Sequence, residues 1–168
     1  MTAEPQAQEI PLADEGFWAY LIGPLDGHED AAPLRERMVE VCEASGWPAI
    51  SWSPAESGVT DPGHFFEGVR HAVEHADFVV ALLGSTEGWA DGELAMAYGH
   101  RRPIVGICLS DEDSSIAKAR TTLESYELAR VISCDDVDEC AAGLRDVLAD
   151  PDFAATVHTA AREIETDG

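Results

Sequence analysis

Three carboxylates, Asp77, Asp91 and Glu93, lie within one stretch of the 168-residue chain, DFVVALLGSTEGWADGELAMAYGHRRPIVGI (residues 77–107). This stretch predicts a buried strand, a glycine-bearing loop, a helix that begins with acidic residues, and a second buried strand. The carboxylates therefore fall at the ends of elements, which is where an open α/β sheet binds its ligands. A carboxylate in such a place can act as a nucleophile.

Each carboxylate also has a plain structural interpretation. Glu93 lies in the first turn of its predicted helix, where the macrodipole favours the ionised form that a nucleophile needs, but where helix capping explains it equally well. Asp77 opens a strand that is otherwise apolar, so its charge must meet solvent, cap a helix or act in a site. We interpret Asp91 as a helix cap. Their combination is therefore more informative than any one of them.

Several common catalytic motifs are missing from the sequence. Neither GxGxxG nor GxxxxGK[ST] occurs, which argues against the usual dinucleotide and nucleoside triphosphate loops. GxSxG and HExxH are also absent, and the six histidines do not form a metal-ligand set. His71 and His75 are four residues apart and could share a metal, but the acidic Glu67 and Glu74 beside them favour a solvated helix face. We expect no metal and no cofactor.

The four cysteines, Cys42, Cys108, Cys134 and Cys140, are widely spaced and include no CxxC pair. Neither a zinc site nor a disulfide framework is indicated by this spacing. We expect all four cysteines to have a structural role.

The elements that would position these residues alternate along the chain. Apolar runs predict strands at 17–22, 47–52, 77–83 and 129–134, with one more that reaches Ile107. Helical patterns fall at 31–45, 64–76, around Glu93, at 115–126, at 137–148 and from 151 to about 163. This alternation predicts an α/β fold, a doubly wound, flavodoxin- or Rossmann-like sheet of five parallel strands with helices on both faces and right-handed crossovers.

Local signals mark where several elements begin and end. Pro33 suits the first turn of a helix, and Gly46 suits the position after its last turn. Asp135 and Asp136 are expected to cap the helix that follows them. Residues 53–63, with two prolines and two glycines, predict a loop that covers a substrate. The pair Arg101 and Arg102 is expected to cap a helix end rather than bind phosphate.

The chain length fits one α/β domain. We expect a flexible acidic segment at 1–15, the domain at 16–150, and a C-terminal helix with a polar tail at 151–168. No apolar run approaches the roughly 20 residues of a membrane span, and residues 1–15 do not have the pattern of a signal peptide. A cytoplasmic protein is therefore expected.

The charge is strongly negative, with 33 acidic and 10 basic residues, a net charge of −23, and Lys118 as the single lysine. Such a charge argues against duplex nucleic acid and anionic membranes as partners. An acidic shell suited to a high-salt cytoplasm explains the shortage of lysine, because salt screens its self-repulsion. A GC-rich genome is the alternative explanation.

Three motifs in order resemble the nucleoside 2-deoxyribosyltransferase-like superfamily. They are YLIGP (residues 20–24), HADFVVALL (75–83), and a glycine loop that leads to E-x-x-x-A-Y-G-x-x-x-P (93–103). This group includes nucleoside deoxyribosyltransferases and nucleoside 5′-monophosphate N-glycosidases, and the resemblance covers about residues 17–150. It implies cleavage of an N-glycosidic bond by a double displacement, on a nucleoside or nucleotide substrate, by a homodimer or larger homo-oligomer.

The resemblance also implies a role for individual residues. Glu93 would attack the anomeric carbon, Asp77 would position the sugar or protonate the leaving base, and Tyr20 would contact the nucleophile or the base. The pocket floor and the groups around the sugar 5′ end would come from Gly23, Pro24, Gly84, Ser85 and Gly88, and Trp89 would stack on the base or plug the loop.

Two alternatives remain open from the sequence. Leu25 and Asp26 follow the Gly-Pro pair where the nucleotide hydrolases of the group tend to have a basic residue, which favours a non-catalytic module that senses a nucleotide-like ligand. A relative of TIR-type NAD glycohydrolases would place a glutamate in a similar sheet and cleave the same type of bond in NAD.

Overall fold

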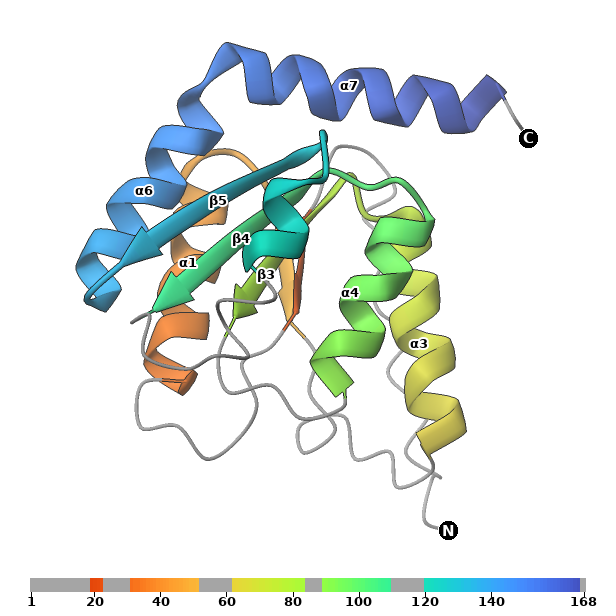
Figure 1. Ribbon diagram of the computed structural model, residues 1–168, viewed down its shortest axis with the longest axis horizontal. Coiled ribbons are helices and arrows are strands. Elements are labelled where there is room, and N and C mark those ends of the chain that lie inside the picture. The colour runs from red at the N-terminus through yellow and green to blue at the C-terminus, as the bar shows by residue number, and fades with distance from the viewer. Residues whose placement is uncertain (1–18, 23–30, 52–61, 84–88, 110–119, 167–168) are drawn as a thin grey trace, which may run out of the picture.

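The fold is described from a computed structural model (Figure 1). It describes residues 19–22, 31–51, 62–83, 89–109 and 120–166. Five strands form one sheet in the order β2-β1-β3-β4-β5. Every neighbouring pair is parallel, and the arrowheads of β3, β4 and β5 in Figure 1 point the same way. The strands are β1 (Ala19–Ile22), β2 (Ala49–Ser51), β3 (Phe78–Leu83), β4 (Ile104–Leu109) and β5 (Ala129–Cys134).

Helices cover both faces of this sheet, which confirms the predicted doubly wound architecture. One core lies beneath α3 (Pro62–His75), α4 (Trp89–Gly99) and the helical residues 120–124. The other lies beneath α1 (Ala31–Ala44), α6 (Val137–Ala149) and α7 (Pro151–Thr166). Side chains of β3 alternate between the two cores as a strand requires, with Val79, Ala81 and Leu83 in the first and Phe78, Val80 and Leu82 in the second.

The described strand pairs end at different heights along the sheet. Ile22, the last residue of β1, pairs with Ala81, so β3 continues for two more residues beyond the end of β1. The short β2 ends one residue lower still, because Ser51 pairs with Leu21. On the other side β4 accompanies β3 to its end, where Cys108 pairs with Leu83. Within the described residues, the paired part of the sheet therefore reaches further along β3 and β4 than along β1 and β2.

The end of α1 follows the predicted pattern, with Gly46 after the last turn. The Trp47 N–H donates to the Cys42 carbonyl at 2.8 Å, and the Gly46 N–H donates to the Glu43 carbonyl at 3.0 Å. Gly46 itself has φ 89°, in the left-handed region that favours glycine. This is the Schellman arrangement, which satisfies carbonyls that the helix would otherwise leave unpaired.

The end of α4 repeats this arrangement with an arginine in place of the glycine. The Arg102 N–H donates to the Ala97 carbonyl at 3.0 Å, and the Arg101 N–H donates to the Tyr98 carbonyl at 3.1 Å. Arg101 has φ 53°, which a residue with a Cβ adopts only at a cost.

Substitutions at these two turns are expected to have opposite effects. A Cβ at Gly46 would meet no atom within 4 Å, so Gly46→Ala should cost only backbone strain and lower the free energy of unfolding by about 1 kcal/mol. Arg101→Gly should raise it by about 0.5 kcal/mol, because the strain is relieved. Urea denaturation of both variants measures the difference. Stabilisation by Gly46→Ala would contradict the turn geometry.

The start of α6 confirms the predicted acidic cap. Asp136 is the N-cap residue, and its Oδ1 accepts a hydrogen bond from the Glu139 N–H at 2.8 Å. The Glu139 carboxylate in turn accepts from the Asp135 N–H at 2.9 Å. Two backbone donors at the helix start are thereby satisfied, in a variant of the capping box.

One pair of cysteines corrects the sequence analysis, which indicated no disulfide. Cys134 and Cys140 are bonded to each other, with their Cα atoms 5.5 Å apart. Cys134 is the last residue of β5, and Cys140 lies on the buried side of α6, so the turn between them brings the two sulfurs together. Cys42 and Cys108 keep their thiols and are buried, as predicted, and burial raises the pKa of the Cys42 thiol to about 12.

Thiol counting provides a direct check on this bond. When the protein is unfolded in denaturant without reductant, two of its four cysteines should react with a thiol reagent, and all four should react after reduction. Reduction should also lower the free energy of unfolding by about 2 kcal/mol, because the short loop is no longer closed in the unfolded chain. Four reactive thiols before reduction would contradict the assignment.

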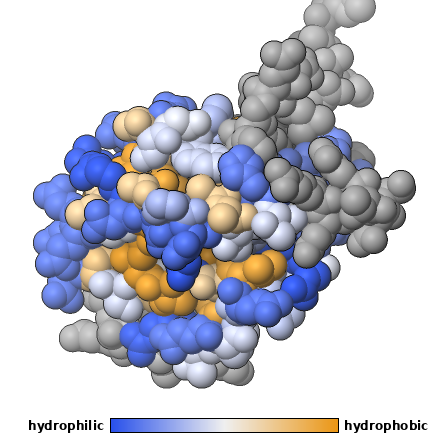
Figure 2. Space-filling view, turned by 90° about the horizontal axis from the view of Figure 1, so that it is seen from above, coloured by the Kyte–Doolittle hydropathy of each residue, from blue (hydrophilic) through white to orange (hydrophobic). Residues whose placement is uncertain are grey.

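The described surface is mostly hydrophilic. Figure 2, seen from the α7 side, shows hydrophilic residues around most of the described periphery, with apolar residues between them. Among the described residues, Tyr98 is the large hydrophobic side chain that stands out in solvent, at 50% exposure. None of the described helices is both long enough and apolar enough to cross a membrane.

Candidate functional site

The strand order places the candidate site where β1 and β3 lie side by side. The chain leaves β1 towards β2 on one side of the sheet, whereas β3 leads on to β4 on the other. Sheets of this kind bind ligands at such a reversal, outside the carboxyl ends of the strands. The predicted binding residues Gly23 and Pro24 follow β1 directly, and Gly84, Ser85 and Gly88 follow β3. These five residues lie outside the part of the chain that the structure describes.

Tyr20 lies within β1, two residues before its end rather than at its end. It pairs with Ile50 of β2 and Val79 of β3. Its side chain is fully buried, including the hydroxyl oxygen, on the sheet face that α3 and α4 cover. The phenol is therefore held rigidly beneath the helix that carries the predicted nucleophile.

Helix α4 returns along β3 after starting at the carboxyl edge. Ala97 anchors it, because this residue is fully buried in the same core as Tyr20, and α4 contacts β1 as well as α3. Position 93 is one turn before Ala97, so it falls on the same helical face about 6 Å nearer the carboxyl edge. The side chains of Trp89, Asp91 and Glu93 are outside what the structure describes.

Asp77 occupies the opposite edge of the sheet. It immediately precedes Phe78, the first residue of β3, so the whole strand separates it from the carboxyl edge, a distance of about 20 Å. Asp77 therefore lies far from the carboxyl ends of β1 and β3. Its carboxylate instead acts electrostatically on Arg102, where it favours the charged guanidinium.

Arg102 links several elements of the fold, whereas the sequence predicts only that it caps a helix end. Its Nε donates to the carbonyl of Val73 at 3.1 Å and its Nη2 to the carbonyl of Glu74, so it caps the end of α3 rather than that of its own helix. The side chain is only 6% exposed. Burial lowers the pKa of the guanidinium, and the negative charges of Asp77 and Glu74 oppose this shift.

Tyr126 holds the backbone of Arg102 from the other side. The Tyr126 hydroxyl donates to the Arg102 carbonyl at 3.0 Å, and burial raises the pKa of this phenol. Arg102 thereby joins α3, the turn after α4, and the segment before β5. The arginine pair in the sequence predicts a capped helix end. It does not indicate that Arg102 caps α3.

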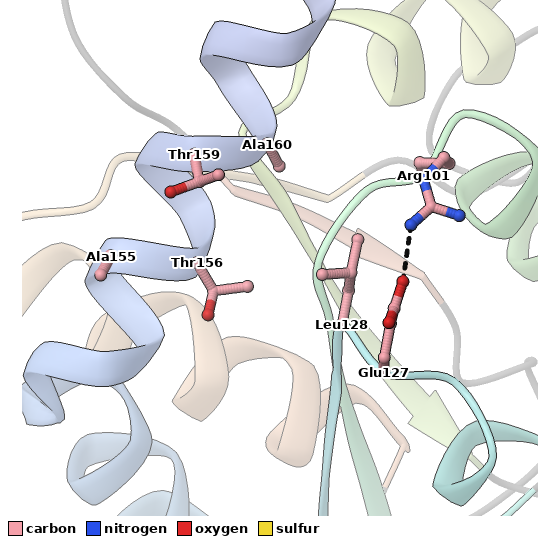
Figure 3. Close-up of a pocket in the computed structure, with 7 residues that line it drawn as sticks. All are labelled: Arg101, Glu127, Leu128, Ala155, Thr156, Thr159 and Ala160. Carbon is pink, nitrogen blue, oxygen red and sulfur yellow. Dashed lines mark hydrogen bonds and ion pairs between the residues drawn. The ribbon is translucent and has the colours of Figure 1, made fainter.

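A cavity of about 360 Å³ lies at the same amino edge, between α7 and the turns before β4 and β5 (Figure 3). Arg101 and Glu127 form an ion pair at 2.8 Å on one side, and the hydroxyl-bearing Thr156 and Thr159 of α7 lie on the other. Because it opens at the amino edge, this cavity is separate from the candidate site. Within the described part of the chain, no three metal-ligating side chains gather into a possible metal centre.

Comparison with known proteins identifies the fold. No family model and no curated protein sequence matches the chain. Among solved structures, the Clostridium botulinum CMP N-glycosidase BcmB is similar, with a TM-score of 0.58 and 15% identity over 75% of this chain and 96% of that one. The glycotransferase of kitacinnamycin matches with a TM-score of 0.46 and 18% identity, over 92% of this chain and 43% of that one. The chain thus has the α/β fold of a solved N-glycosidase.

Proposed function

We propose that this protein cleaves or transfers the N-glycosidic bond of a nucleoside or nucleoside 5′-monophosphate. The observation that carries the proposal is the register of α4. With Ala97 buried over the same sheet face as Tyr20, position 93 lies one turn closer to the carboxyl edge, beside the reversal between β1 and β3. A glutamate at this position suits attack on a ligand that rests on the strand ends.

The reaction proceeds in two displacements. A carboxylate oxygen of Glu93 attacks the anomeric carbon, the bond to the base nitrogen breaks, and the base leaves with the electron pair and takes a proton from water. This gives a glycosyl ester on Glu93. Water or a second base then attacks the same carbon and loses a proton to solvent, and the ester bond breaks, which regenerates the Glu93 carboxylate. Attack by water gives the free sugar, and attack by a second base gives a new nucleoside. The configuration at the anomeric carbon is retained.

Other predicted residues would support this reaction. Tyr20, buried beneath α4, would hydrogen-bond the Glu93 carboxylate or the leaving base. Backbone groups around Gly84, Ser85 and Gly88, with the N-terminus of α4, would bind the sugar 5′ end or its phosphate. We assign Asp77 to Arg102 and leave it out of the reaction, because it lies at the amino edge.

The resemblance in fold to a CMP N-glycosidase supports this proposal, because CMP is a nucleoside 5′-monophosphate. The same class of substrate is implied by the motifs at residues 20–24, 75–83 and 93–103. We propose a small-molecule nucleoside or nucleotide as the partner and a homodimer or larger homo-oligomer as the working form.

A substrate panel tests the proposal. Purified protein is incubated in low and high salt with nucleosides, deoxynucleosides, their 5′-monophosphates and NAD, and free base is followed by chromatography. Release of base from a nucleoside or its monophosphate is the expected result. Release from NAD alone would favour the TIR-like alternative, whereas binding without release would favour the sensing module.

A further inference from the structure

We propose that His71 and His75 form a surface site for a divalent transition cation such as Ni²⁺ or Zn²⁺. Both residues lie in the last turn of α3, four residues apart and therefore on one helical face. Both side chains are exposed, and their ring centroids are 4.3 Å apart. Two imidazoles at this spacing on a helix are a recognised pair of ligands for such cations.

A hydrogen bond prepares one of the rings for this role. The Nδ1 of His75 lies 2.8 Å from the backbone carbonyl oxygen of His71. Because a carbonyl oxygen can only accept, Nδ1 carries the proton, and the lone pair of the neutral ring resides on Nε2. Metal-ligating histidines characteristically donate their second ring N–H to a carbonyl or carboxylate in this way.

The surroundings favour a cation at this place. The exposed Glu67 lies one turn before His71, and the protein as a whole carries a net charge of −23. An acidic surface raises the local concentration of divalent cations.

The site consists of two protein ligands, and water completes the coordination shell. Glu74 lies between the two histidines in sequence but faces other partners, with its Oε1 3.7 Å from the Nε2 of His100 and 3.9 Å from the Nε of Arg70. No third metal-ligating side chain joins the pair among the residues that the structure describes. Nitrogen ligands select borderline cations over Mg²⁺, which prefers oxygen.

Occupancy of this site should stabilise the end of α3. A metal held by both rings links the two ends of the last helical turn, and a ligand that binds only the folded form raises the melting temperature. The proposal is independent of the reaction proposed above, because it concerns an exposed helix face.

Isothermal titration with NiCl₂ on tag-free, chelator-treated protein tests the site. Wild type should bind Ni²⁺ more tightly than Mg²⁺, and excess Ni²⁺ should raise its melting temperature until EDTA is added. His71→Gln and His75→Gln should each weaken Ni²⁺ binding roughly tenfold or more and remove the shift in melting temperature. Both side chains are exposed and the hydrogen bond of His75 lies at the surface, so the melting temperatures without metal should stay close to that of wild type.

His158→Gln, on the exposed side of α7, is the matched control and should bind Ni²⁺ as wild type does. Equal loss in His158→Gln and His71→Gln would overturn the site, because binding would then be spread over the surface. A loss in His100→Gln as large as that in His71→Gln would also overturn it, since the cation would then lie between α3 and α4. No preference for Ni²⁺ over Mg²⁺ in wild type would do the same.

Discussion

Glu93→Gln is expected to reduce base release from the substrate identified in the panel by about a thousandfold or more. The amide has nearly the shape of the carboxylate, but it lacks the charge and the nucleophilic oxygen that form the glycosyl ester. Single-turnover chromatography measures the rate. Mass spectrometry of rapidly quenched wild type should in addition find the sugar on the peptide that contains Glu93, and the variant should lack this adduct.

Two neighbouring carboxylates serve as controls. Asp91→Asn is expected to keep base release, because Asp91 is interpreted as a helix cap, and loss of activity there with Glu93→Gln still active would move the nucleophile to Asp91. Asp77→Asn is expected to keep most activity but to lower stability, because Asp77 neighbours the buried Arg102. An inactive but equally stable Asp77→Asn would return Asp77 to the reaction.

Arg102→Met is expected to lower the free energy of unfolding by roughly 3 kcal/mol or more. Methionine fills similar space but donates no hydrogen bond, so the carbonyls of Val73 and Glu74 lose their donors at the end of α3. Asp77 also loses the cation beside it. Urea denaturation monitored by circular dichroism gives the difference in stability.

Arg101→Met is the matched control for this substitution. It changes the adjacent residue in the same way, but the ion pair that Arg101 makes with Glu127 lies in solvent, with side-chain exposures of 60% and 74%. Such pairs contribute less than about 1 kcal/mol. Equal losses of stability in Arg101→Met and Arg102→Met would contradict the prediction, because the buried hydrogen bonds of Arg102 would then contribute no more than the exposed ion pair of Arg101.

The sheet could be predicted because its signals are local. Each buried strand is a short apolar run between turn residues, and Gly46, Asp135 and Asp136 mark helix ends by chemistry that acts within a few residues. The all-parallel order follows from helices that alternate with strands. These features depend on neighbours in sequence, so one sequence suffices to find them.

The disulfide and the role of Arg102 depend on contacts that no local pattern records. Cys134 and Cys140 meet because β5 ends where α6 turns back over the sheet, and a spacing of six residues alone does not indicate this. Arg102 reaches carbonyls 28 and 29 residues earlier in the chain. Only the packed positions of α3 and α4 bring these groups together.

The strand order and the packing of α4 decide which predicted residues can meet at the candidate site. Asp77 and Glu93 were grouped because both fall at element ends, yet in a parallel sheet the first residue of every strand lies at the amino edge, away from the ligand edge. The strand order therefore separates them. Tyr20 and the α4 helix, in contrast, share one sheet face, which follows from the packing of α4 and not from the sequence pattern of β1.

The described strand pairs extend further on the β3 side of the candidate site than on the β1 side. Among the described residues, β3 pairs with β4 for two residues beyond its last pair with β1, a length of about 7 Å. The predicted substrate-covering loop, residues 53–63, follows β2 in the sequence, and β2 is the strand on the other side of β1. Residues 53–61 of this loop lie outside the part of the chain that the structure describes. Because the loop is predicted to cover the substrate, shortening it should change which substrates are admitted more than it changes the rate of bond cleavage.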